Sequence, residues 1–465
     1  MHLVSILLLS ATLAVSFTTP LQAKHREGVS DVRQYELDNG MKILVKEDHR
    51  APVVVSQVWY KVGSSYEHNG ITGVSHVLEH MMFKGTKTLG PNEFSKIIAA
   101  NGGRENAFTG KDYTAYFQSL HKDRLEVSMR LEADRMQNLS LREEDFVKEV
   151  NVVKEERRLR TEDKPTSLTY EQFIATAFQS SPYHHPIIGW MEDLDSMRLE
   201  DLQAWYERWY SPSNATLVII GDVEADKVYR MAKKHFGPIP ASKIKPLKPQ
   251  RETKQRGERR LKVRAQAEVP YLLMGYKVPV LLTAKEPNEV YALEVIAGIL
   301  DGGNSARLSK DLVRGTQIAV SAGAGYDMYD RIDNLFLFDG RPSTGNSIEV
   351  LEKALREQIV RLQTTLATQD ELDRIKAQVI AAKVYELDSV FYQGMQIGTL
   401  ETVGLDHTRL DEYVTRVRAV TPAQVQAVAK KYLIDEGLTV AILDPINEKK
   451  ENNKATAAKG ADHAK

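Results

Sequence analysis

One segment of this chain occurs twice, and the repeat constrains the fold more than any other feature of the sequence. LQAWYERWYSPSNATLVIIGD (202–222) and QVQAVAKKYLIDEGLTVAILD (424–444) align without a gap at an offset of 222 residues. Each copy reads as a helix that ends in tyrosine, a short turn, and an apolar strand that ends in aspartate. Two copies of one α/β unit are therefore predicted. This agrees with a length of 465 residues, which is too long for one typical core.

The first half mixes strands with helices. Apolar and polar residues alternate on both sides of the turn signal Asp38-Asn39-Gly40, which predicts a β-hairpin followed by a longer strand. Apolar spacing predicts helices at HVLEHMMF, in PNEFSKIIAANGG and through most of 125–160, and ENAFTGKDYTAYFQSL alternates as a strand does. We predict an α+β fold with two homologous α/β sandwich domains in tandem, each with an antiparallel-rich sheet covered by helices.

Residues 1–23 are typical of a secretory signal peptide. They contain an apolar run from Leu3 to Phe17 and the small-residue exit LQA, so we expect cleavage after Ala23. At roughly 15 residues the run is short for a membrane span, although an uncleaved anchor is the alternative. Mitochondrial targeting segments are rich in arginine, and this one has no arginine before Arg26. A periplasmic or secreted bacterial protein is therefore predicted.

Composition also marks the other boundaries. A segment rich in proline and basic residues predicts a linker at 241–262. It would separate an N-terminal metal-binding domain (24–240) from a C-terminal repeat domain (263–446). Residues 447–465 are polar and predict a disordered tail. The linker lacks the interleaved aromatic residues of a nucleic-acid surface, so no nucleic-acid partner is expected.

Charge and cysteine content exclude several classes of protein. The chain has 62 Lys and Arg against 63 Asp and Glu, so no overall field favours nucleic acid or an acidic substrate. It has no cysteine, which excludes disulfides, a thiolate nucleophile and thiolate metal ligands. Any metal must therefore be held by His, Asp or Glu.

The segment HVLEH contains a possible metal-binding pair. Residues four apart on a helix lie about 40° apart around its axis, so His76 and His80 can aim at one point. Glu79 lies on the same side. Two neutral imidazoles can hold a divalent cation while a carboxylate that is not a ligand takes a proton from the attacking water. With 12 histidines the pattern arises by chance in roughly one such chain in 50, so surface histidines are the alternative.

A catalytic zinc needs a third protein ligand, and FVKEVNVVKEERRLR offers carboxylates. Glu149 and Glu156 are seven residues apart, so one side of a helix carries both, together with Val152 and Val153. Burying a lone carboxylate is costly, so a glutamate on a partly apolar face needs a partner. We predict Glu156 as the third ligand and Glu149 as a supporting carboxylate. A solvated run of charges is the alternative.

HVLEH, followed 76 residues after His80 by Glu156 within EVNVVKEE, resembles the inverted zinc motif of the pitrilysin family of metallopeptidases. The branch with the mitochondrial processing peptidases is the most similar, and NGGRENAFTGKDYTAYF and SPYHHPIIGWMEDL also resemble family segments. The resemblance spans about 31–445. It implies that His76, His80 and Glu156 bind one Zn²⁺, that Glu79 is the general base of peptide hydrolysis, and that Glu149 supports the site.

The resemblance also implies where a substrate binds. The strand around Asn106, Ala107 and Phe108 is expected to be an edge onto which a peptide adds as a further strand, the alternative being a strand that pairs internally. His184 and His185 are neighbours in a segment expected to be extended. Their side chains should then point apart, so we assign them to structure rather than to metal binding.

One departure from the family pattern bears on assembly. Active members usually carry an arginine and a tyrosine seven residues apart in the second half, where this chain has Val313 and Val320. Arg314 is one place out of register, and no tyrosine follows until Tyr326. Neither valine can donate a hydrogen bond to a developing charge. The chain therefore resembles the zinc-bearing subunit of two-subunit members, in which a metal-free relative supplies the missing groups.

The expected function is that of an exported zinc endopeptidase that acts on oligopeptides or unfolded segments. The resemblance implies a clamshell chamber, of which this chain supplies half, so we expect a heterodimer, with a homodimer as the alternative. A non-catalytic peptide-binding or assembly subunit of the same fold is a second possible function, and a zinc buffer is a third.

Overall fold

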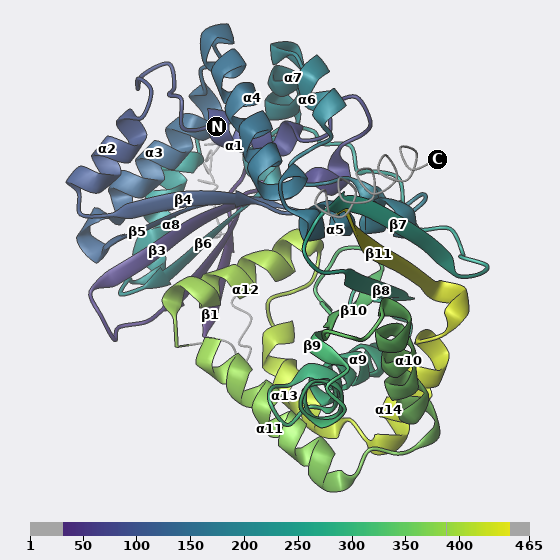
Figure 1. The fold of residues 1–465 in the computed structure, drawn as a ribbon. Helices are drawn as coiled ribbons and strands as arrows, with labels where there is room; N and C mark the ends of the chain where they lie inside the picture. The colour runs from purple at the N-terminus through teal and green to yellow at the C-terminus, as the bar shows by residue number, and fades with distance from the viewer. Residues whose placement is uncertain (1–30, 387, 447–465) are drawn as a thin grey trace, which may run out of the picture.

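A computed structural model of the chain describes residues 31–386 and 388–446 (Figure 1). The expected signal peptide and the expected tail at 447–465 lie outside these ranges. The described residues form two halves, each with one sheet and a layer of helices, which confirms the predicted α+β fold with two related domains. No helix in the described ranges combines the length and the apolar character that crossing a membrane requires.

The N-terminal sheet has six strands in the order β1-β2-β6-β3-β5-β4. They are β1 (Val32–Glu36), β2 (Lys42–Glu47), β3 (Val53–Tyr60), β4 (Arg104–Thr109), β5 (Thr114–His121) and β6 (Ala215–Gly221). β1 and β2 form the predicted hairpin. Gly40 supplies the left-handed φ of 83° that its turn requires. β4 is an edge strand of this sheet.

The C-terminal sheet has five strands in the order β7-β11-β8-β10-β9. They are β7 (Arg259–Gln266), β8 (Tyr271–Val278), β9 (Ala319–Gly325), β10 (Asn334–Pro342) and β11 (Leu438–Ile446). Strand β7 begins at Arg259, so the irregular part of the expected linker 241–262 ends before that residue.

The sequence repeat corresponds to a structural repeat. Helix α7 (Leu199–Trp209) precedes β6, and helix α14 (Pro422–Tyr432) precedes β11. Strand β6 runs parallel to β2 and antiparallel to β3, and β11 runs parallel to β7 and antiparallel to β8. The repeated strand thus has the same kind of neighbours in both sheets, which confirms two copies of one unit.

One face of each sheet is covered by helices from the same half of the molecule (Figure 1). In the N-terminal half they are α1 (Val74–Met81), α2 (Glu93–Ala100), α3 (Leu125–Asn138), α4 (Glu143–Arg157), α6 (Met191–Ser196), α7 and α8 (Ala225–Phe236). In the C-terminal half they are α9 (Pro287–Asp301), α10 (Ile348–Thr364), α11 (Gln369–Glu386), α13 (Arg409–Ala419) and α14.

Two helices cross between the halves and cover the opposite faces. Helix α5 (Pro165–Ala177) packs on β7, β8 and β11, where Phe173 joins an apolar cluster with Leu273. Helix α12 (Val390–Val403) packs on the N-terminal sheet at β3 and β6 (Figure 1). There Ile397 joins an apolar cluster with Trp59. Each half therefore depends on the other to bury one face of its sheet.

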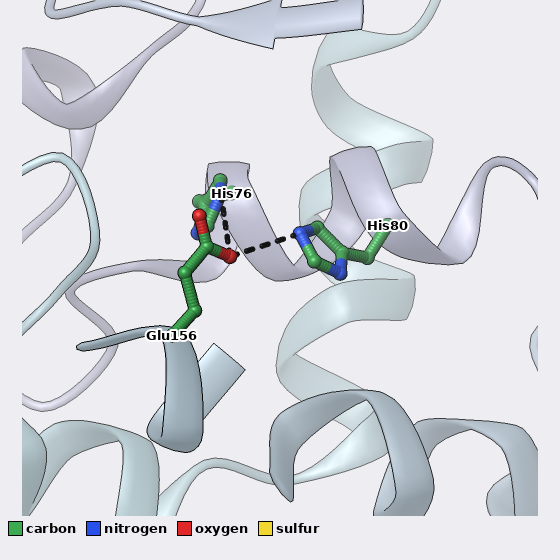
Figure 2. Close-up of side chains that lie close together, drawn as sticks. All are labelled: His76, His80 and Glu156. Carbon is green, nitrogen blue, oxygen red and sulfur yellow. Dashed lines mark ion pairs between the residues drawn. The ribbon is translucent and has the colours of Figure 1, made fainter. Parts of the chain in front are cut away.

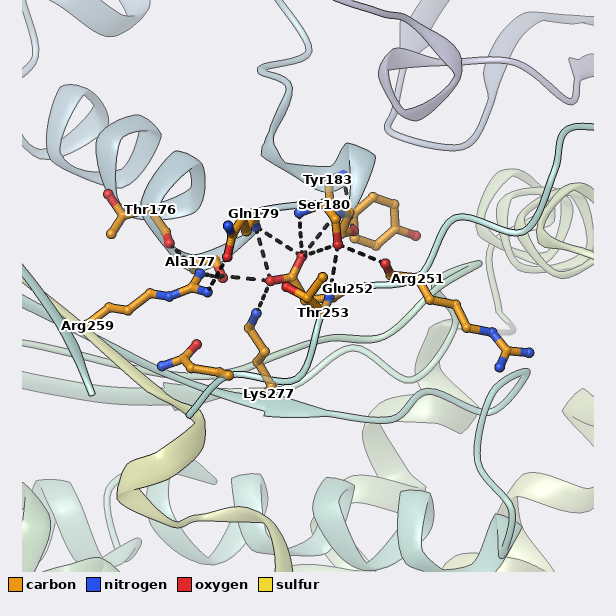
Figure 3. A network of polar contacts seen from close by, with 12 residues as sticks. Thr176, Ala177, Gln179, Ser180, Tyr183, Arg251, Glu252, Thr253, Arg259 and Lys277 are labelled. Atoms are coloured by element: carbon orange, nitrogen blue, oxygen red, sulfur yellow. Dashed lines mark hydrogen bonds and ion pairs between the residues drawn. The ribbon is translucent and has the colours of Figure 1, made fainter. Parts of the chain in front are cut away.

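Polar contacts fix the linker at the joint between the halves (Figure 3). The carboxylate of Glu252 accepts backbone hydrogen bonds from Gln179, Ser180 and Ser181 at 2.9 to 3.1 Å. It also pairs with the ammonium of Lys277 on β8. Burial opposes the charge of Glu252, but the ammonium and the three N–H groups lower its pKa to about 2.

A second joint, which we call the clasp, consists of Arg331 with Asp112, Ser65 and Tyr183. Arg331 precedes β10 and reaches into the N-terminal half, where its Nε donates to Asp112 at 2.9 Å. Its guanidinium also donates to Ser65 at 2.8 Å, and its backbone N–H donates to the Tyr183 hydroxyl at 3.0 Å. The clasp is largely buried, so it ties the two halves together in a medium with little water.

Candidate metal centre

Helix α1 presents both histidines, and a buried carboxylate fixes its start. Glu67 accepts hydrogen bonds from the backbone N–H groups of Gly73 at 2.7 Å and Ser75 at 2.9 Å. A carboxylate in this place satisfies free donors of the first turn and lies at the positive end of the helix dipole. Gly73 has a left-handed φ of 88°, and a Cβ there would overlap the carbonyl oxygen of Ile188. The start of α1 is therefore held against the loop around Ile188.

The three predicted ligands converge (Figure 2). The Oε2 atom of Glu156 lies 3.8 Å from Nε2 of His76 and 3.5 Å from Nε2 of His80. Ligand atoms about 2.0–2.1 Å from a tetrahedral zinc are about 3.4 Å apart. Burial lowers the pKa of His76 to about 3, which keeps its imidazole neutral, as a metal ligand must be. The donor set and its spacing therefore fit a single divalent cation.

Glu149 contacts the far side of the His80 ring. Its Oε2 lies 3.3 Å from Nδ1 of His80, and its Oε1 lies 2.7 Å from Nζ of Lys84. A carboxylate at Nδ1 favours the tautomer that leaves the Nε2 lone pair facing Glu156. Glu149 is thus placed where a supporting carboxylate was expected.

Glu79 is beside the ligands but not among them. The hydroxyl of Thr109 on β4 donates to its Oε2 at 2.5 Å. Burial raises the pKa of Glu79, which brings this carboxylate closer to the range in which it can exchange protons near neutral pH. A carboxylate next to the ligands is in a position to take a proton from a water at the centre.

The centre opens into a cavity of about 960 Å³. One wall is the edge strand β4, from which Asn106, Ala107, Phe108 and Thr109 line the space. Other parts of the lining come from α5 and from Tyr271 on β8, so both halves contribute. Asn106, Ala107 and Phe108 therefore lie on an edge strand beside the metal centre, as expected of a strand that receives a peptide.

Two features of the α4 region were not foreseen. Val153 is buried, but Val152 is 48% exposed and lines a surface hollow together with Glu156, so the shared side of the helix is only partly buried. Arg160 was missed, although it follows Glu156 by the one-turn spacing at which helical side chains meet. Its guanidinium lies 2.7 Å from Oε1 of Glu156, and it lines the cavity.

His184 and His185 both line the cavity, and the expectation that they point apart was wrong. Their ring centroids are 4.2 Å apart at an interplanar angle of 78°. The reason is local: a tight turn spans Pro182–His184, whereas the expectation assumed an extended segment. Nε2 of His185 lies 3.2 Å from the side-chain oxygen of Asn69, and neither ring joins a metal-ligand group within the described residues.

In a second group of possible ligands, Glu401, Asp406 and His407, the Glu401 carboxylate already has other partners. The ammonium of Lys42 lies 2.5 Å from Oε2 of Glu401, and His407 Nδ1 lies 2.9 Å from Oε1. Because Lys42 comes from β2 and Glu401 from α12, this cluster is an ion pair between the halves.

The two valines that we expect at the positions of the family's arginine and tyrosine do not line the cavity. Val313 packs against the C-terminal core, and Val320 is 64% exposed on β9. The hydroxyl of Tyr326 donates to the carbonyl of Pro279 at 2.6 Å. None of these three side chains lines the cavity at the metal centre.

Two related sheets and a His-His-Glu centre with a carboxylate beside it define the metallopeptidase class of fold and site. Residues 42–190 match the model of insulinase, peptidase family M16, and residues 196–379 match that of the peptidase M16 inactive domain. The zinc protease PqqE of Helicobacter pylori is 33% identical over 414 residues, which cover 88% of this chain and 92% of that protein. The chain belongs to peptidase family M16.

Solved structures agree with this assignment. The crystal structure of a protease from Helicobacter pylori has a TM-score of 0.84 and 31% identity, and covers 89% of this chain and 99% of that one. The periplasmic protease PqqL of Escherichia coli shares the fold at a TM-score of 0.75 and 16% identity. The match covers 91% of this chain but only 48% of PqqL.

Proposed function

We propose that this chain is a zinc-dependent endopeptidase that hydrolyses oligopeptides or unfolded segments. One observation carries the proposal: the ligand atoms of His76, His80 and Glu156 lie within 4.8 Å of one another at a cavity that Glu79 and an edge strand also line. The relative from Helicobacter pylori is named a zinc protease, which supports zinc as the cation.

Each side chain has a chemical role in this proposal. A zinc ion held by His76, His80 and Glu156 would supply a Lewis acid that acidifies water and polarises the scissile carbonyl. Glu79 takes a proton from the attacking water and returns it to the leaving amine. The hydroxyl of Thr109 holds the Glu79 carboxylate in place at 2.5 Å. Glu149 keeps the His80 ring oriented through Nδ1.

The edge strand β4 is the proposed binding site for the peptide main chain. An added strand is held by backbone hydrogen bonds, which are the same for most sequences, so recognition depends on an extended conformation more than on particular side chains. Asn106, Ala107 and Phe108 would contact the residues next to the scissile bond. Folded domains would be excluded, because they have no free extended segment to offer.

We further propose that the chain is the zinc-bearing subunit of an exported heterodimer, in the branch of the mitochondrial processing peptidases, with a homodimer as the second candidate. The valines at 313 and 320 support a partner that supplies hydrogen-bond donors. The match to about half of PqqL supports an assembly with twice the content of this chain. The apolar segment at 1–23 supports export to the periplasm.

The deciding experiment is cleavage of a quenched peptide library by the wild-type chain, by Glu79→Gln and by Glu155→Gln, alone and with a candidate partner. We expect little cleavage by the chain alone and clear cleavage with the partner. Glu79→Gln should lose at least about 100-fold, because general-base catalysis contributes that much, with zinc content unchanged. Glu155 is exposed on α4, so Glu155→Gln should match the wild type.

Several outcomes would count against these assignments. Full activity of Glu79→Gln would contradict its role as the base. Strong activity of the isolated chain would contradict the heterodimer. Peptide binding without any zinc-dependent cleavage would instead indicate a non-catalytic binding subunit.

A further inference from the structure

Only two of the described residues that line the cavity carry a fixed positive charge, Lys111 and Arg160. The ammonium of Lys111 lies 4.6 Å above the ring of Tyr183, where the aromatic face engages it. Arg160 is at the end of the cavity that holds the metal ligands, and its side chain is 71% exposed. A cation that is accessible to solvent and adjacent to the centre is accessible to a bound peptide as well.

Arg160 contacts the half of the Glu156 carboxylate that faces away from the histidines. Its Nη1 lies 2.7 Å from Oε1, whereas Oε2 is the oxygen that faces His76 and His80. A guanidinium has several N–H donors in a rigid planar fork, so one contact leaves donors for another acceptor. Arg160 can therefore hold the third ligand and bind a second group at the same time.

The backbone places Arg160 between two hollows. After α4 the chain enters a wider, π-helical turn at Arg158–Glu162, a distortion that is frequent at functional sites. Glu156 and Arg160 line both the main cavity and a neighbouring hollow of about 540 Å³. The exposed side chains of Val152 and Leu159 lie on the side of the second hollow. Arg160 thus lies between the two hollows, beside the metal ligands.

An ordinary surface ion pair is the competing explanation. Exposed pairs one helical turn apart contribute little to stability, so this explanation predicts no effect on either folding or chemistry when Arg160 is replaced. The geometry favours more than that. Arg160 contacts the third predicted ligand and lines the same cavity as Glu79 and both histidines. Its guanidinium is therefore placed where a peptide bound at the centre would meet it.

We propose that Arg160 is a substrate-anchoring residue: while it holds Glu156, its remaining N–H groups bind the carbonyl oxygen of the scissile peptide bond. This role presupposes the peptidase activity proposed above. The carbonyl oxygen gains negative charge as water attacks, so a fixed guanidinium stabilises it more in the transition state than in the ground state. In this way Arg160 supplies a donor in a chain whose positions 313 and 320 hold valine.

The test compares Arg160→Met and Arg160→Lys with Arg158→Gln in the active assembly. Arg158 belongs to the same turn, but it pairs with Glu155 and does not line the cavity. We expect kcat/KM to fall about 10–1,000-fold in Arg160→Met, mainly through kcat, as for the loss of an oxyanion donor. Arg160→Lys should recover part of this loss, because it keeps the charge but not the fork. Arg158→Gln should match the wild type.

Two further measurements separate anchoring from mere support of Glu156. A phosphinic peptide mimics the tetrahedral transition state, so its affinity, measured by calorimetry, should fall in Arg160→Met by about as much as kcat/KM does. An ordinary peptide should bind the inactive Glu79→Gln variant and the double variant Glu79→Gln/Arg160→Met with almost equal affinity. Zinc affinity, by chelator competition, and Tm should stay near the wild-type values. Lower zinc affinity with full activity at saturating zinc would overturn the proposal, and so would unchanged kcat and phosphinic-peptide affinity.

The same assays show which proposal has failed. If Glu79→Gln loses activity and Arg160→Met does not, only the role of Arg160 is wrong. If Glu79→Gln is fully active, the proposed mechanism itself is wrong. Where turnover is absent, the affinity of the phosphinic peptide still decides, because an unchanged value in Arg160→Met contradicts anchoring.

Discussion

Glu149 contacts the metal centre only through His80. Replacing it therefore tests how far the centre depends on residues that do not face the cation. Its Oε2 lies 3.3 Å from Nδ1 of His80 and its Oε1 lies 2.7 Å from Nζ of Lys84. Removing this charge leaves the Lys84 ammonium without its partner and weakens the orientation of the ring. Such outer carboxylates commonly contribute about 10–100-fold to metal affinity or activity.

We therefore expect Glu149→Gln to bind zinc about 10–100-fold more weakly, measured by chelator competition. The exposed Glu144→Gln, in the first turn of the same helix, is the matched control and should bind zinc as the wild type does. Equal zinc affinity in Glu149→Gln and the wild type would show that the His80 ring is held by packing alone.

Helical geometry explains which site residues could be predicted from sequence. His76, Glu79 and His80 share one short helix, and Glu149 and Glu156 share one side of another, so spacing alone predicted their directions. Spacing does not say what lies opposite a side chain. The exposure of Val152 could not be predicted, because an open hollow lies beside it. Arg160 was missed because an exposed arginine after a charge run has no distinctive pattern.

At the scale of elements, the packing of α12 on the N-terminal sheet depends on two glycines one turn apart. A Cβ on Gly398 would overlap the indole of Trp59, and a Cβ on Gly394 would lie 2.7 Å from the side-chain oxygen of Gln57. Trp59 and Gln57 both belong to β3, and Trp59 is fully buried. The helix can therefore approach the sheet only because these positions lack side chains.

Gly398→Ala should lower the free energy of unfolding by about 1–3 kcal/mol through overpacking. Thermal unfolding measures the change, with a lower Tm expected. Gly325→Ala is the control, because a Cβ at Gly325 meets no atom within 4 Å. A Tm for Gly398→Ala at or above that of the wild type would mean that α12 can shift away from the sheet without cost.

Helix α5 packs on the C-terminal sheet and helix α12 on the N-terminal sheet, and this crossing could not be predicted from the sequence. Turn signals and alternation predicted the first hairpin, and the repeat predicted the equivalent placement of β6 and β11. Periodicity shows that a helix has an apolar face, but any apolar surface of suitable shape can cover that face. Which sheet each helix covers follows from contacts between residues more than 200 positions apart in α12 and β3, and local sequence does not encode these.

For the whole molecule, the clasp decides how firmly the halves are joined. The carboxylate of Asp112 is 2% exposed and receives Arg331 Nε at 2.9 Å. Removing one partner of a buried ion pair is costly, because the other charge stays buried without compensation. Tyr183 belongs to the clasp and also lines the cavity, so the joint and the metal centre share a wall.

Arg331→Met should therefore lower the free energy of unfolding by about 3–5 kcal/mol, measured by urea denaturation. The double variant Arg331→Met/Asp112→Asn should recover part of this loss, because a neutral amide costs less to bury than a carboxylate. Limited proteolysis should cleave the single variant faster than the wild type. A single variant as stable as the wild type would show that Asp112 finds water or another donor.

The joint at Glu252 in the linker makes stability depend on pH. The folded pKa of Glu252 is about 2, below the value of about 4.3 that glutamate has in an unfolded chain. A group with a lowered folded pKa stabilises the fold above its unfolded pKa and loses that contribution as the pH falls toward its folded pKa. After an allowance for solvent screening, we expect Glu252 to contribute roughly 2 kcal/mol at neutral pH.

The measurement is the difference in unfolding free energy between the wild type and Glu252→Gln, by urea denaturation from pH 7 down to pH 3. The difference should be roughly 2 kcal/mol at pH 7 and should shrink below about pH 4.5, because the wild-type carboxylate then becomes protonated in the unfolded chain. The exposed Glu268→Gln should show almost no difference at any pH. A difference for Glu252→Gln that stays constant with pH would mean that its hydrogen-bond geometry, and not its charge, holds the linker to the residues around Ser180.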